Sequence, residues 1–147
     1  MSDAAEVLIS QCRQAGQRIT APRRIIADVV AKADDHPDVP EIYRRVAEID
    51  PTISLSTVYR TVKIFASTGL VERHSFAGGR ARIEPASEVH HDHLFDIESG
   101  AVIEFRSDEI ERLQALVAKE LGFELTGHRL VLYGRPLARK ARRARKP

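Results

Sequence analysis

The chain has 147 residues, enough for one ordinary domain or two small ones, and its 43% hydrophobic and 30% charged residues suit a soluble globular protein. No stretch approaches the roughly 18 apolar residues of a membrane-spanning helix, and the first residues do not resemble a secretory signal. The single cysteine, Cys12, excludes an internal disulfide. We therefore expect a cytoplasmic protein that does not associate with membranes.

The net charge of +2 conceals an uneven distribution along the chain. Residues 1–85 hold 12 basic and 11 acidic groups, whereas residues 86–134 hold 4 and 10. Residues 135–147 carry seven Lys or Arg and no acidic residue. This division predicts two domains with different partners, followed by a disordered basic tail over residues 135–147.

Four helices are expected in the first half of the chain. The first covers residues 3–16 and ends at a glycine. Thr20, Asp38 and Ser54 have the character of N-cap residues, and each precedes apolar residues that recur with helical spacing. Gly69 ends the fourth helix.

A β-hairpin is expected after these helices. Two short strands, over residues 70–76 and 80–84, flank a turn that contains Gly78 and Gly79. Helices followed by a hairpin are typical of a winged helix-turn-helix, and we assign this DNA-binding fold to residues 1–84. Residues 85–89 are then expected to form a hinge.

The second half has a different pattern. Strands are expected over residues 93–97, 101–105 and 125–133, with a helix that begins at Ser107 between the last two. A sheet with one helix is too small to bury both of its faces, so we expect residues 90–134 to form an α/β dimerisation domain. The predicted fold class is α+β, and the predicted assembly is a homodimer.

The strongest chemical signal is the run His90-His91-Asp92-His93. Side chains alternate between the two faces of a strand, so His91 and His93 should lie on one face and His90 and Asp92 on the other. Imidazole nitrogen with carboxylate oxygen suits Fe(II), Mn(II) or Zn(II). Isolated histidines are more often surface or hydrogen-bonding residues, but three histidines and an aspartate in a row favour metal binding over that alternative.

Basic and hydroxyl side chains indicate a DNA surface in the first half. The Ser/Thr-rich start of the fourth helix offers amides and hydroxyls to phosphates, and the residues after it lie where a recognition helix meets base edges. Some of these charges, Arg24 above all, are equally consistent with an ordinary solvated helix face. The candidate DNA-binding residues are Arg18, Arg23, Ser54, Ser56, Thr57, Tyr59, Arg60 and Lys63.

Several motifs in the correct order resemble the ferric uptake regulator family over residues 5–134. The matching runs are Arg18-Ile-Thr-Ala-Pro-Arg23, Ser56-Thr-Val-Tyr-Arg60, Gly69-Leu-Val71, His90-His-Asp-His-Leu94 and Gly100-Ala-Val-Ile-Glu-Phe105. The resemblance implies a metal-responsive transcriptional regulator that binds double-stranded operator DNA as a dimer, and not an enzyme.

The resemblance also assigns the functional residues. It implies a regulatory metal site at His36, Glu84, His91, His93 and Glu104, and a second site at His90, Asp92, Glu111 and His128. It matches the family's minor-groove residue to Arg18 and its base-contacting pair to Tyr59 and Arg60. One departure is that Asp96 and Ser99 stand where many members carry a zinc-binding Cys pair, so no Cys-ligated structural zinc is expected.

The sequence does not decide which signal this member of the family senses. Sensors of zinc, manganese and peroxide are the alternatives, with a metalloenzyme or a structural metal protein as rival classes. Peroxide sensors tend to carry Asp where Glu84 and Glu104 stand, which favours Fe(II) here. Mn(II) and Zn(II) are expected to substitute for it.

Overall fold

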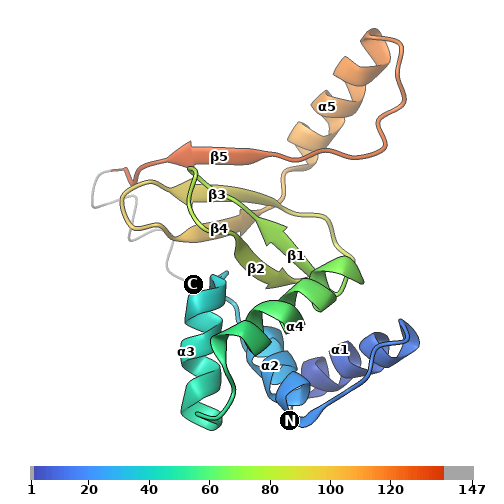
Figure 1. The fold of residues 1–147 in the computed structure, drawn as a ribbon. Helices are drawn as coiled ribbons and strands as arrows, with labels where there is room; N and C mark the ends of the chain where they lie inside the picture. Colours follow the sequence, from blue (N-terminus) through green and yellow to red (C-terminus); the bar gives the residue numbers. More distant parts are fainter. Residues whose placement is uncertain (1, 138–147) are drawn as a thin grey trace. The chain divides into compact units, whose positions relative to one another are not determined.

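The computed structural model describes residues 2–137, and the chain divides between Glu88 and Val89 into two compact units (Figure 1). This division lies within the expected hinge over residues 85–89, which itself stays a prediction. Of the basic tail expected over residues 135–147, only residues 135–137 lie within the described part. No helix in the described part is both long and apolar enough to cross a membrane.

Four helices form most of the first unit: α1 (Asp3–Gln14), α2 (Ala21–Lys32), α3 (Val39–Ile49) and α4 (Leu55–Ser67). The predicted N-caps are confirmed, because the side chains of Thr20, Asp38 and Ser54 accept backbone hydrogen bonds at 3.3, 2.9 and 3.2 Å. A cap of this kind contributes about 1 kcal/mol to helix stability. The start of each helix is therefore set by local sequence.

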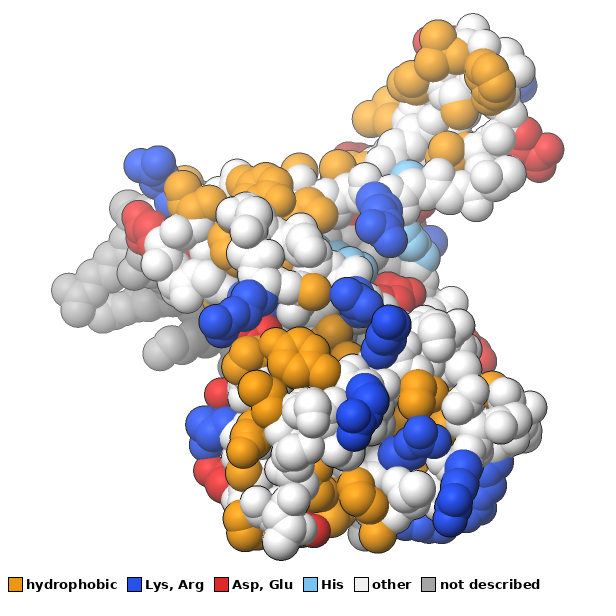
Figure 2. Space-filling view, viewed as in Figure 1, with side chains coloured by type: hydrophobic (Ala, Val, Ile, Leu, Met, Phe, Trp, Pro, Cys, Tyr) orange, Lys and Arg blue, Asp and Glu red, His pale blue; other side chains and the backbone are white. Residues whose placement is uncertain are grey.

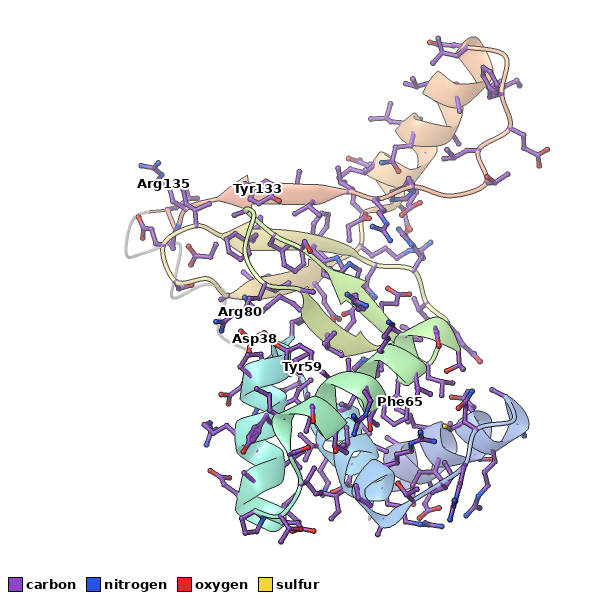
Figure 3. All side chains as sticks on the ribbon, in the orientation of Figure 1. Asp38, Tyr59, Phe65, Arg80, Tyr133 and Arg135 are labelled. Atoms are coloured by element: carbon purple, nitrogen blue, oxygen red, sulfur yellow. The ribbon has the colours of Figure 1, made fainter. Side chains whose placement is uncertain are left out.

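The apolar faces of these helices share one core. Phe65, Ile26 and Ile42 are among its largest fully buried side chains, and Phe65 points from α4 into the helix cluster (Figure 3). Cys12 is fully buried in the same core. Burial raises the pKa of its thiol against a smaller opposing effect of Arg23, so Cys12 has the character of a packing residue.

The predicted hairpin is present but shorter than expected. Strands β1 (Val71–His74) and β2 (Arg82–Pro85) pair antiparallel, with Glu72 opposite Glu84. The strands end early because Ala77 and Gly78 adopt positive φ angles of 50° and 71°, which turn the chain out of the ladder. Val71 and Ile83 belong to the helical core, whereas Glu72, His74 and Glu84 share the other face.

The second unit is a small sheet with one helix. Its elements are β3 (Asp92–Asp96), β4 (Val102–Phe105), α5 (Asp108–Glu120) and β5 (Val131–Gly134). The strand order is β4-β3-β5, antiparallel between β3 and β4 and parallel between β3 and β5. The prediction of a strand over residues 125–133 is wrong in its first half, because the ladder with β3 begins only where Val131 pairs with His93.

The apolar face of α5 is exposed. The helix begins at Ser107, whose side chain accepts a hydrogen bond from the backbone N–H of Ile110 as predicted, but none of its residues is buried. Figure 2 shows apolar side chains gathered on its surface. The architecture confirms the expected α+β class, a winged helix-turn-helix followed by a small α/β unit.

Candidate metal centres and nucleic-acid interface

Four potential metal ligands converge in the second unit: His90, Asp92, Glu111 and His128, with ligand atoms within 4.8 Å of one another. His90 precedes β3, Asp92 begins it, Glu111 lies on α5 and His128 precedes β5. The Nε2 atoms of His90 and His128 are 3.0 Å apart, and they lie 3.1 and 3.0 Å from Oδ1 of Asp92. Oε1 of Glu111 lies 3.6 and 3.8 Å from the same two nitrogens.

These separations match the first coordination shell of a divalent ion. Ligands at about 2.1 Å from one ion lie about 3.4 Å apart in a tetrahedron and about 3.0 Å apart along an octahedral edge. The observed range of 3.0–3.8 Å covers both arrangements. The set of two imidazoles and two carboxylates suits Fe(II), Mn(II) or Zn(II) and offers no soft sulfur ligand.

The burial of the carboxylates supports the same interpretation. Asp92 is 1% exposed, and neither its Oδ2 nor the buried Oε1 of Glu111 has a hydrogen-bond partner among the described residues. A buried carboxylate oxygen without a partner is costly in a folded protein. A bound cation is the kind of group that removes this cost.

The other face of β3 carries a second group of candidate ligands. The His91 and His93 rings lie 4.9 Å apart, and His93 is paired with Glu104 of β4 in the ladder. Nε2 of His91 lies 3.6 Å from Oε1 of Glu104. The alternation predicted from the sequence thus separates these three residues from His90 and Asp92.

The first unit contributes two further candidate ligands. His36 lies in the loop after α2, four residues beyond Lys32, where its Nε2 is 2.6 Å from Oε2 of Glu84 on β2. Its φ angle of 52° is strained for a residue that precedes a proline. Arg82 donates a hydrogen bond to the His36 carbonyl, and Ile83 donates one to that of Pro37 at 2.9 Å. These contacts hold His36 against the hairpin.

Glu84 connects two histidines. Its Oε1 lies 2.7 Å from Nε2 of His74, while its Oε2 faces His36. Burial alone raises the pKa of the Glu84 carboxyl, but the hydrogen bonds with His36 and His74 outweigh burial and hold this pKa well below its usual value. Sequence reasoning missed His74, although its two-residue spacing from Glu72 on a predicted strand was a usable signal.

The predicted DNA-binding residues of α4 are on the surface. The hydroxyls of Ser54, Ser56 and Thr57 form a hydrogen-bonded group at the start of the helix, with Ser54 Oγ 3.0 and 2.9 Å from the other two. Arg60 donates a hydrogen bond to Thr57 Oγ1 at 3.3 Å. This group presents oxygen, amide and guanidinium functions together at a helix N-terminus, which suits phosphate binding.

A groove of about 480 Å³ separates α4 from the hairpin. It is lined by Tyr59, Arg60 and Lys63 of α4 and by Arg73 and Arg80 of the hairpin. Tyr59 and Arg80 are labelled in Figure 3. The two hairpin arginines were not predicted, although Arg80 directly follows the Gly pair that marks the turn. Four cations around an apolar floor form a surface suited to polyanions.

Arg18 and Arg23 have different surroundings. Arg18 is exposed in the loop before α2, whereas the Arg23 guanidinium donates a hydrogen bond to the Arg18 carbonyl. Arg18 therefore suits direct contact with DNA, and Arg23 supports the loop that carries Arg18. The proposed role of Arg23 in DNA binding is then an indirect one.

The chain is similar to known proteins over most of its length. The model of the Ferric uptake regulator family matches residues 14–133. The ferric uptake regulation protein of Rhizobium leguminosarum bv. viciae is 52% identical over 140 residues, which are 95% of this chain and 99% of that protein.

Solved structures give the same result. A zinc-bound manganese uptake regulator is 53% identical, with a TM-score of 0.78 over 88% of this chain and 98% of its own. The ferric uptake regulator of Pseudomonas aeruginosa with manganese is 40% identical, with a TM-score of 0.75 over 88% and 98% of the two chains.

Proposed function

The chain belongs to the ferric uptake regulator family of metal-dependent transcriptional regulators, and we propose from this membership that it binds operator DNA as a homodimer in response to Fe(II). The convergence of imidazole and carboxylate groups in each unit is the observation that carries the proposal. Regulation, rather than catalysis, is the activity of this family.

The regulatory site takes its ligands from both units. His36 and Glu84 belong to the winged helix, and His91, His93 and Glu104 belong to the α/β unit. Within each unit the proposed ligands lie close to one another, and this closeness supports the assignment. A metal ion bound by both subsets fixes one unit against the other.

The second site has a different role because all its ligands belong to one unit. His90, Asp92, Glu111 and His128 join the sheet to α5 and to the segment before β5. Binding there stabilises the α/β unit without restricting the hinge. We therefore assign signal detection to the first site and structural support to the second.

DNA affinity follows from the geometry of the dimer. Two half-sites on DNA require one spacing between two recognition helices. With a mobile hinge over residues 85–89, the winged helices of the metal-free dimer adopt many orientations. The regulatory site selects the arrangement that matches the operator from this ensemble, and linkage requires that DNA tighten metal binding equally.

The choice of Fe(II) rests on Glu84 and Glu104 and on the relatives named ferric uptake regulation protein. Structural relatives named manganese uptake regulator, one of them zinc-bound, support substitution by Mn(II) and Zn(II). Divalent affinity rises from Mn(II) through Fe(II) to Zn(II) at most protein sites, so Zn(II) should bind tightly in vitro whichever metal is the signal.

An anaerobic titration tests the proposal. We expect Fe(II) and Mn(II) to convert purified protein from weak to tight retardation of promoter DNA, with the response lost in chelator. Because the imidazole ligands must be neutral to bind the ion, the affinity for metal should decrease when the pH is lower than about 6. Retardation that does not depend on any metal would contradict the proposed function.

Substitutions on the DNA surface should separate base contacts from phosphate contacts. Tyr59→Ala should weaken operator binding by about 1–3 kcal/mol with little effect on non-specific DNA. Arg60→Ala should weaken operator binding by a similar amount and should also lower the affinity for non-specific DNA, because its guanidinium lies in the group suited to phosphate. Arg80→Ala should weaken binding to all DNA sequences. It should also lower by about 1 the slope of the logarithm of affinity against the logarithm of salt concentration.

Arg18→Ala should lose the preference for a narrow A·T-rich minor groove. Wild-type operator affinity in Tyr59→Ala and Arg18→Ala would show that this surface is wrongly placed.

A further inference from the structure

His74 is a histidine that neither proposed metal site uses. It lies at the end of β1, and the ladder places Glu72 opposite Glu84, so His74 shares a face of the hairpin with both. Its Nε2 lies 2.7 Å from Oε1 of Glu84 and 3.3 Å from Oε2 of Glu72. The side chain is only 15% exposed, so this contact is sheltered from water.

The two oxygens of Glu84 have separate partners. Oε2 lies 2.6 Å from His36, and Oε1 lies 2.7 Å from His74. A carboxylate that gives Oε2 to a metal ion beside His36 keeps Oε1 for its bond with His74. Such outer partners orient a ligand and raise its affinity for metal.

His74 is also joined to the turn of the hairpin. Its ring stacks on Phe76 with centroids 5.9 Å apart and planes inclined by 23°. Phe76 is 2% exposed and begins the turn, where its carbonyl accepts a hydrogen bond from Gly79 at 2.9 Å. The turn leads directly to Arg80 of the groove. One side chain thus contacts both a metal ligand and the turn that presents a cation to DNA.

We propose that His74 is a positioning residue that orients the Glu84 carboxylate for the regulatory metal and joins that site to the hairpin turn. This inference rests on the proposed function, since it assumes that Glu84 is a ligand. The alternative is a separate cation site made by Glu72, His74 and Glu84. The contacts favour positioning, because the short bond with Glu84 occupies Nε2 and Glu72 is half exposed.

Two amide substitutions test the proposal. The amide nitrogen of glutamine is as many bonds from Cα as Nε2 of histidine, so His74→Gln keeps a donor toward Glu84. In His74→Asn the amide is one bond shorter and does not reach. The matched control is Ser75→Ala, which alters the adjacent exposed residue. Glu84→Ala serves as the reference for a lost ligand.

The measurement is a Co(II) titration of the full chain, followed by ligand-field absorption. All variants carry His90→Ala and His128→Ala, so that only the regulatory site responds. We expect His74→Asn to weaken Co(II) binding by about 10–100-fold. His74→Gln should recover most of the affinity, and Ser75→Ala should bind as its parent does. The absorption bands should keep their positions in every His74 variant. Metal-free melting curves should show that every variant is folded at the temperature of the titration, with His74→Asn melting below His74→Gln because it leaves the buried Glu84 without its donor.

The outcomes distinguish the two levels of inference. Parental affinity in His74→Asn, with binding lost in Glu84→Ala, would overturn the role of His74 and leave the proposed function intact. Equal losses in the Gln and Asn variants with shifted bands would make His74 a ligand and also overturn its positioning role. Parental affinity in Glu84→Ala would overturn the regulatory site itself, and with it this inference.

Discussion

Replacement of His91 and His93 by alanine should leave a folded dimer whose affinity for operator DNA no longer rises when metal is added. Both residues belong to the α/β unit, and their loss removes the imidazole ligands that we propose this unit contributes to the regulatory site. We expect the loss to equal the full allosteric coupling, about 5–150-fold in DNA affinity per site. Fluorescence anisotropy of labelled operator DNA, with and without Mn(II), measures it.

The matched control is the double variant His90→Ala, Asp92→Ala, which removes two ligands from the same segment of the chain. Its ligands all lie within one unit, so the hinge should still respond to metal. We expect reduced thermal stability with largely retained metal activation. If this variant loses activation while the His91 and His93 variant keeps it, the two faces of β3 have been assigned the wrong way round.

Local sequence was sufficient for the helices but not for the strands. A helix start needs only a capping side chain and the amides of the next turn, so Thr20, Asp38 and Ser54 were readable directly. A strand exists only where a partner strand pairs with it. Residues 125–130 have strand-like sequence, but the ladder with β3 begins at Val131.

The same distinction applies to the sites. The alternation of a strand correctly separates His91 and His93 from His90 and Asp92, since that property is local. Folding brings Glu111 and His128 close to His90 and Asp92 over a long sequence distance, and only the family resemblance suggested them as candidate ligands. His74, Arg73 and Arg80 were missed because their role depends on which hairpin face meets which neighbour.

The second prediction with a large expected effect concerns the exposed apolar face of α5, which we propose as the dimer interface. Along α5, a groove of about 440 Å³ is lined by apolar residues that include Leu113 and Val117, each 52% exposed. Exposed apolar faces of this kind mark interfaces, and family members act as dimers. Asp96 and Ser99, which replace a Cys pair, are joined to each other instead by a 2.8 Å hydrogen bond from Ser99 Oγ.

The double variant Leu113→Glu, Val117→Glu should therefore be monomeric at micromolar concentration. An unpaired charge buried in an apolar interface costs about 3–5 kcal/mol, at least about 100-fold in the dimerisation constant. Operator affinity should fall with it, because each monomer contacts a single half-site. Ala115→Glu is the control, since it adds one such charge on the side of α5 opposite to Leu113 and Val117. Sedimentation velocity measures the oligomeric state of both variants.

Chelation tests what holds the interface together. The unaltered chain should stay dimeric in strong chelator if apolar packing holds the interface. A monomer in chelator would show that metal, rather than the face of α5, holds the two copies together.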